Sequence, residues 1–157
     1  MDKQQPVRIL IVEDEPIIAL TLQDLLVEAG FEVVCVTGKL QRALAVIEGA
    51  GCDAAIVDAN LGGVSTSSAA LALATRRVPF IVLSGYSSEQ LQGDFPSARF
   101  LRKPCRPDKL IHTLKAMVLK QISSPLDRPL LRTDLATASS AGRTLDLPVL
   151  GAARVKR

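Results

Sequence analysis

Short apolar runs alternate along the chain with longer amphipathic stretches, from residue 7 to residue 121. The runs are too short for helices and are apolar throughout, which is typical of strands buried on both faces of a sheet. Between them, apolar residues recur at helical spacing. The pattern predicts five strands within residues 7–12, 31–36, 53–58, 78–85 and 97–104, and helices over residues 16–30, 40–51, 65–77 and 107–121.

This alternation predicts an α/β fold in which a doubly wound, five-stranded parallel sheet has helices on both faces. The crossovers are expected to be right-handed. Ligands of such sheets bind beyond the carboxyl ends of the strands, where the strand order changes direction. The segment over residues 86–96 is polar and short, so any helix there is expected to be truncated or disordered.

The helical stretches also predict which side chains face the sheet. In the last helix the expected apolar face consists of Leu110, Leu114, Met117 and Val118. Pro16 suits the first turn of the first helix. The apolar face expected for that first helix consists of Ile17, Leu20, Leu22, Leu25, Leu26 and Ala29.

Periodicity stops after residue 121. Residues 122–157 contain six Lys or Arg and three Asp, which accounts for the whole net charge of +3. We therefore predict one domain over residues 1–121, followed by a basic and disordered tail over residues 122–157. A docking segment built from leucines is the alternative for the tail; these are Leu130, Leu131 and Leu135.

The composition excludes several classes of protein. No apolar run approaches a membrane span and the N-terminus does not look like a signal peptide, so a soluble, cytoplasmic protein without membrane contact is expected. Three cysteines lie far apart without metal-type spacing and are expected to be reduced thiols: Cys35, Cys52 and Cys105. Because the body of the chain is electrically neutral, direct DNA binding is not expected.

Polar side chains follow four of the predicted strands. Glu13 and Asp14 follow the first strand, Asp58 ends the third, Ser84 ends the fourth and Lys103 follows the fifth. Each residue alone would also fit a turn, a helix cap or a loop. Because the carboxyl ends of parallel strands share one edge, we expect the five to meet in one crevice.

A group of carboxylates at one place needs a compensating charge. A solvated loop is one interpretation, and a bound divalent cation is the other. Oxygen ligands without His or Cys favour Mg²⁺ over zinc. Asp58 is then the candidate nucleophile for an aspartyl phosphate, with Lys103, the Ser84 hydroxyl and the Gly85 N–H available to phosphoryl oxygens.

These residues and their surroundings resemble the receiver domain of bacterial two-component response regulators. The resemblance covers residues 7 to about 120 and rests on "VED", "VDANLGG", "LSGY" and "RKP" at the successive strand ends. It implies the flavodoxin-like fold. Tyr86 after Ser-Gly is similar to a Thr-Gly-Tyr-like stretch in a subgroup of single-domain receivers from α-proteobacteria.

The resemblance implies a function for each position of the crevice. It assigns Glu13, Asp14, Asp58 and the backbone carbonyl of Asn60 to Mg²⁺. It makes Asp58 the acceptor of a phosphoryl group from a phosphohistidine, carried by a sensor histidine kinase or a histidine phosphotransfer protein. Glu15 matches no metal position and is expected to help cap the first helix.

The resemblance also implies how the phosphoryl group is sensed. Lys103 and Ser84 would contact it, with help from the backbone N–H groups of Ala59 and Gly85. Ser84 would move toward the phosphate, and Phe100 would turn inward into the space left behind. Phe100 as a plain core residue is the alternative. The Lys103–Pro104 bond is expected to be cis.

The expected function is that of a stand-alone receiver, acting by contact with a downstream protein or as a phosphate sink. It is not expected to be an enzyme beyond its own phosphorylation and dephosphorylation, and its oligomeric state stays open. One alternative is a phosphorylation-independent interaction module with a relic pocket. The other is a phosphatase of the haloacid-dehalogenase type, which would need an acid where Asn60 follows Asp58.

Overall fold

The computed structural model describes residues 4–96 and 98–123 of the chain. Five strands form one parallel sheet in the order β2-β1-β3-β6-β7, and a separate antiparallel hairpin is formed by β4 and β5. The strands are β1 Arg8–Val12, β2 Glu32–Thr37, β3 Ala54–Asp58, β4 Asn60–Leu61, β5 Val64–Ser65, β6 Phe80–Ser84 and β7 Arg99–Arg102. The helices are α1 Pro16–Glu28, α2 Leu40–Glu48, α3 Ser67–Thr75, α4 Ser88–Leu91 and α5 Pro107–Ser123. The predicted doubly wound α/β fold is confirmed.

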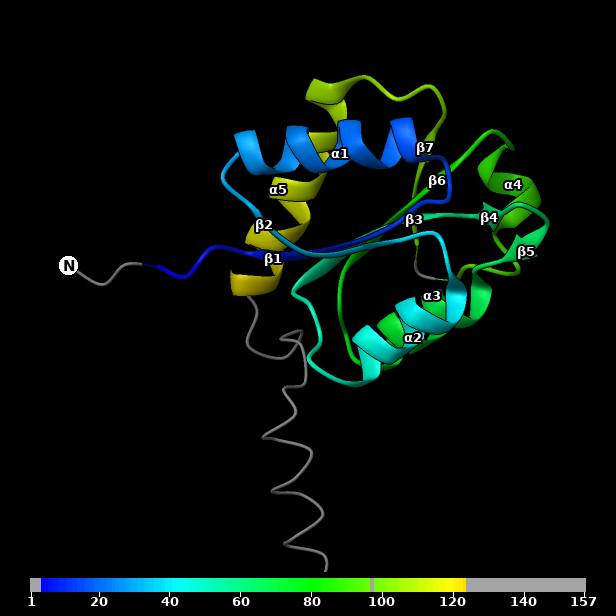
Figure 1. Ribbon diagram of the computed structural model, residues 1–157, viewed down its shortest axis with the longest axis horizontal. Helices are drawn as coiled ribbons and strands as arrows, with labels where there is room; N and C mark the ends of the chain where they lie inside the picture. Colours follow the sequence, from blue (N-terminus) through cyan, green and yellow to red (C-terminus); the bar gives the residue numbers. More distant parts are fainter. Residues whose placement is uncertain (1–3, 97, 124–157) are drawn as a thin grey trace, which may run out of the picture.

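Helices cover both faces of the sheet. In Figure 1, α1 and α5 lie above it, and α2 and α3 lie below it. Alternate residues of β1 therefore enter two different cores: Ile9 and Ile11 pack on the α1 and α5 side, and Leu10 and Val12 pack on the other. All four side chains are at most 1% exposed, because β1 lies between β2 and β3. This explains why the strands read as continuous apolar runs.

The face predicted for α1 is wrong in part. Ala19, Leu22 and Leu26 form the buried stripe of α1, at positions i, i+3 and i+7. Ile17 and Leu20 were predicted to face the sheet but point away from that stripe, with 78% and 59% of their surface exposed. The face predicted for α5 is confirmed, with three buried residues and a partly buried Met117; the buried ones are Leu110, Leu114 and Val118.

The segment after Asp58 forms a short hairpin. β4 and β5 pair as Asn60 with Ser65 and Leu61 with Val64, and Gly62 and Gly63 connect them. Both glycines have positive φ angles, 60° and 99°, as a two-residue type I′ turn requires. Strands of two residues are too short to produce a visible alternation of apolar and polar positions.

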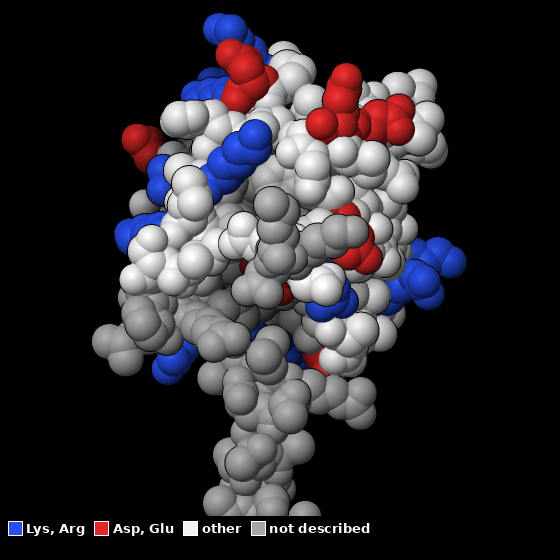
Figure 2. All heavy atoms as spheres, turned by 90° about the vertical axis from the view of Figure 1, so that its left-hand side faces the viewer, with Lys and Arg blue, Asp and Glu red and all other residues white. Residues whose placement is uncertain are grey.

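The remaining expectations concern the short helix, the chain end and the surface. α4 has only four residues, in agreement with the expected truncation. The predicted tail lies outside the described residues, except that Ile122 and Ser123 continue α5. Within residues 4–96 and 98–123, no helix is long and apolar enough to cross a membrane. Figure 2 shows acidic and basic side chains interspersed on the described part of one face.

Candidate functional site at the carboxyl edge of the sheet

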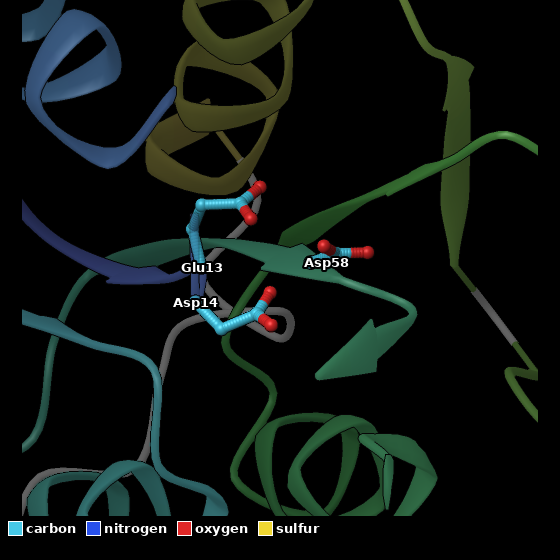
Figure 3. A group of neighbouring side chains, drawn as sticks. All are labelled: Glu13, Asp14 and Asp58. Carbon is cyan, nitrogen blue, oxygen red and sulfur yellow. The ribbon is translucent and has the colours of Figure 1, made fainter. Parts of the chain in front are cut away.

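Three carboxylates meet where β1 and β3 end. The parallel register places Val12 beside Val57, so the residues that follow the two strands come out next to each other. Glu13 and Asp14 leave the end of β1 in different directions, and Asp58 lies at the end of β3 (Figure 3). One oxygen from each of these three carboxylates lies within 4.8 Å of the others.

Lys103, which follows the edge strand β7, contacts two of these carboxylates. Its Nζ lies 3.0 Å from Oε2 of Glu13 and 2.9 Å from Oδ2 of Asp58. The backbone of Lys103 is itself fixed, because its N–H donates to the carbonyl of Ser84 at 2.9 Å. The expected cis peptide between Lys103 and Pro104 is present.

The pKa values of Glu13 and Lys103 are both raised, but for different reasons. Burial raises the pKa of Glu13, and hydrogen bonds from the Glu15 N–H and from Lys103 only partly oppose this effect. Burial acts to lower the pKa of Lys103, but hydrogen bonds to Asp58 and Glu13 outweigh it and leave the pKa above its usual value. Lys103 is therefore a fixed cation at neutral pH, in contact with two carboxyl groups.

Hydrogen bonds fix both the side chain and the backbone of Asp58. Its Oδ1 accepts the Asn60 N–H at 3.2 Å, and its Oδ2 accepts Lys103. Its backbone carbonyl accepts the hydroxyl of Thr66 at 2.6 Å, and Thr66 is completely buried. Thr66 was not among the predicted site residues. A threonine directly before a helix is typical of an N-cap, and Thr66 does precede α3, but its side chain makes no capping hydrogen bond.

Ser84 and Gly85 lie at the end of the neighbouring strand β6. Leu83 pairs with Asp58 across the sheet, so Ser84 comes out one residue beyond it. The Ser84 side chain is buried, and its hydroxyl accepts the N–H of Tyr86 at 2.9 Å. A side chain at Gly85 would meet no atom within 4 Å, so the edge is open there.

The backbone N–H of Ala59 takes part in the pairing of the sheet. The Ala59 N–H, which the resemblance placed on the phosphoryl group, donates to the carbonyl of Leu83 at 3.0 Å. This bond continues the pairing of β3 and β6 one residue past the end of β3. Ala59 therefore stabilises the strand end on which Asp58 lies.

The side chains of two other predicted residues do not belong to the carboxylate cluster. Phe100 is partly buried on β7 and packs edge-to-face on Phe95, with ring centroids 6.3 Å apart and an interplanar angle of 87°. Glu15 occupies the N-cap position of α1, as expected, but its side chain makes no capping hydrogen bond. Its N–H instead donates to Oε1 of Glu13 at 3.1 Å.

The donor set fits a small divalent cation. Opposite ligands of an octahedral Mg²⁺ lie about 4.2 Å apart, given Mg–O distances of about 2.1 Å. Adjacent ligands lie about 3.0 Å apart. The three carboxylate oxygens lie within 4.8 Å of one another, so an inward movement would bring them to a single ion. Asp14 is exposed, which leaves room for the waters that Mg²⁺ retains.

The sequence matches one protein family and is similar to several known proteins. Residues 9–115 match the family described as response regulator receiver domain. The transcriptional regulatory protein PdtaR of Mycobacterium tuberculosis is 31% identical over 121 residues, which cover 74% of this chain and 59% of PdtaR. The transcriptional regulatory protein TcrA of the same organism is 32% identical over 128 residues, which cover 78% of this chain and 49% of TcrA.

A solved structure has a similar fold. The CheY-like response regulator receiver domain protein of Methanospirillum hungatei superposes with a TM-score of 0.67 at 25% identity, covering 76% of this chain and 98% of that one. This chain spans about half the length of the curated relatives that it matches. Because the family match covers more than half of the sequence, the chain belongs to the response regulator receiver domain family.

Proposed function

We propose that this chain is a phosphorylation-dependent signalling switch whose phosphoryl acceptor is Asp58. The observation that carries the proposal is the position of Lys103, within 3.0 Å of both Glu13 and Asp58 at the open edge of the sheet. A fixed ammonium beside a nucleophilic carboxylate is suited to receive a dianionic phosphoryl group. Membership of the family supports a phosphohistidine as the donor.

The transfer is a displacement at phosphorus. A carboxylate oxygen of Asp58 attacks the phosphorus atom, and the bond between phosphorus and the imidazole nitrogen of the donor breaks. The imidazole leaves with that electron pair, so Asp58 carries an acyl phosphate. Lys103 neutralises a phosphoryl oxygen, and the hydroxyl of Ser84 moves from the Tyr86 N–H to donate to another.

A divalent cation belongs to the same proposal. Glu13, Asp14 and Asp58 would hold Mg²⁺ together with the backbone carbonyl of Asn60. When bound, Mg²⁺ balances the carboxylates and the incoming phosphoryl oxygens. The chain's own contribution is to keep the acidic side chains at one edge and to keep Asp58 fixed through its contacts with Thr66 and Asn60.

The proposed output is a change in a surface that another protein contacts. Movement of Ser84 would change the packing around Phe100 on β7, which pairs directly with β6. We propose a sensor histidine kinase or a phosphotransfer protein upstream and a protein target downstream, in the cytoplasm. No reaction on another substrate is proposed, because Asn60 stands where a phosphatase of the haloacid-dehalogenase type would need its second acid.

Labelling with a small phosphodonor tests the proposal. We expect acetyl phosphate to phosphorylate the protein in a Mg²⁺-dependent reaction, to about one phosphoryl group per chain. Asp58→Asn should abolish the product in intact-mass spectra, and Asp24→Asn, at an exposed position on α1, should leave it unchanged.

Three other outcomes would contradict the proposal. Equal labelling of the wild type and Asp58→Asn would place the acceptor elsewhere. No labelling of the wild type, together with no response to beryllofluoride, would favour an interaction module with a relic pocket. Catalytic turnover of phosphate esters would favour the phosphatase.

A further inference from the structure

Two glycines from different parts of the chain lie against Asp14. Gly38 directly follows β2, and a Cβ placed on it would lie 2.7 Å from Cα and 3.1 Å from Cβ of Asp14. The same Cβ would lie 3.3 Å from the carbonyl oxygen of Glu13. On another side, a Cβ at Gly62 in the β4–β5 turn would lie 3.5 Å from Oδ2 of Asp14.

The close approach of Gly38 follows from the pairing of β1 and β2. The Glu13 N–H donates to the carbonyl of Thr37 at 2.9 Å, which continues the pairing one residue beyond Val12. Gly38 must then run directly alongside Asp14. The buried hydroxyl of Thr37 accepts the N–H of Lys39 at 3.0 Å and so fixes the segment on the other side of Gly38.

The constraint at Gly38 is one of space and not of backbone conformation. Gly62 has a positive φ angle of 60°, so any substitution there would strain the backbone as well. Gly38 is outside the positive-φ set, and an alanine could adopt its conformation. The atom in its way is a backbone Cα, which cannot rotate aside as the tip of a side chain can.

We propose that Gly38 is a positioning residue for the acidic pocket, the cluster formed by Glu13, Asp14 and Asp58. Its missing side chain lets the end of β1 approach β2, and this sets how far Asp14 and Glu13 lie from Asp58 on the opposite strand. A side chain at position 38 pushes the Asp14 backbone away from β2 and so changes the spacing of the three carboxylates. The proposal rests on the proposed function and adds the residue that sets the size of its cation site.

Three Gly→Ala variants separate positioning from stability. Gly38→Ala is the test. Gly93→Ala is the neutral control, because a Cβ there meets nothing within 4 Å. Gly49→Ala is the control for a tight contact elsewhere, since its Cβ would lie 2.9 Å from the carbonyl of Ala45 at the end of α2.

Two quantities are measured for each variant: the midpoint of urea unfolding without divalent cations, and the dissociation constants for Mg²⁺ and Ca²⁺ by calorimetry. We expect Gly38→Ala to weaken Mg²⁺ binding by about tenfold or more. Ca²⁺ binding should fall less, because Ca²⁺ accepts a less regular arrangement of ligands than Mg²⁺ does. Gly49→Ala should lower only the unfolding midpoint, and Gly93→Ala should change neither quantity.

The outcomes for Gly38 and for the proposed function are distinguishable. A wild type that neither binds Mg²⁺ nor accepts beryllofluoride would refute the function itself. If the wild type binds Mg²⁺ and Gly38→Ala matches Gly93→Ala, the role of Gly38 is refuted. If Gly38→Ala does not fold, Thr37→Val takes its place, because it removes the acceptor that fixes the segment. Unchanged Mg²⁺ affinity in Thr37→Val would equally overturn the proposal.

Discussion

Lys103 connects two carboxylates that belong to different strands, and its charge is permanent at neutral pH. One ammonium group cannot serve Glu13, Asp58 and a phosphoryl oxygen equally well. A phosphoryl group on Asp58 would therefore redistribute the hydrogen bonds of Lys103. Such a change is local, and it reaches β6 because the N–H of Lys103 donates to the carbonyl of Ser84.

Lys103→Met tests this balance of charge. Without divalent cations we expect the variant to lose about 1–3 kcal/mol of unfolding free energy, because Glu13 and Asp58 are left without their cation. Removing a positive charge 3 Å from the carboxylates should also strengthen Mg²⁺ binding. Thermal unfolding in EDTA and in Mg²⁺ measures both effects. A smaller Mg²⁺-dependent rise in Tm for Lys103→Met than for the wild type would contradict the prediction.

At the scale of single residues, the polar groups at the ends of strands can be predicted from the sequence. Asp58 and Lys103 were predictable because parallel strands bring their carboxyl ends to one edge, so a local pattern determines a distant meeting. Thr66 and Gly38 were not predictable in the same way. Their importance comes from a carbonyl eight positions away and from the backbone of another strand, and no local pattern marks either contact.

At the scale of elements, the short α4 and the strand β7 are joined by two aromatic rings. Phe95 follows α4 and is 1% exposed, and it packs edge-to-face on the partly buried Phe100. α4 has four residues and no buried side chain of its own. Phe95 therefore anchors this segment to the core, whereas Phe100 keeps some freedom to change its packing.

Phe95→Ala should destabilise the protein more than Phe100→Ala does. We expect a loss of about 3–5 kcal/mol for Phe95→Ala, the range for a fully buried phenylalanine. The loss for Phe100→Ala should be smaller, because its side chain is only partly buried. Urea unfolding at equilibrium gives both values. Equal losses would show that Phe95 is not the anchor of α4.

The elements also show where a one-dimensional pattern loses information. The strands were predictable because burial on both faces leaves a continuous apolar run. The face of α1 was not, because α1 carries apolar residues on its exposed side as well, including Ile17 and Leu20. The β4–β5 hairpin was not predicted, because its strands have two residues each and show no pattern. Its two adjacent glycines were the one signal of a turn.

At the scale of the whole molecule, the cluster of Glu13, Asp58 and Lys103 forms only when the sheet is complete. Lys103 is 90 positions from Glu13 and 45 from Asp58. The strands that carry these residues are linked through β6 and β3, so each pairing must form before the three charges meet. An unfolded chain has no such site, and a cation that binds here stabilises only the native state.

The distance along the chain between these residues has a consequence for folding kinetics. The site needs the ends of β1, β3 and β7 in place together, so we expect its contacts to form after the folding transition state. Mg²⁺ at ten times its dissociation constant should then slow unfolding by about tenfold and leave the refolding rate nearly unchanged. Stopped-flow unfolding and refolding in urea would show this, with Asp14→Asn as the control. Faster refolding in Mg²⁺ would mean that the pocket forms early. If the prediction holds, a bound cation lengthens the lifetime of the folded molecule without changing the route by which it folds.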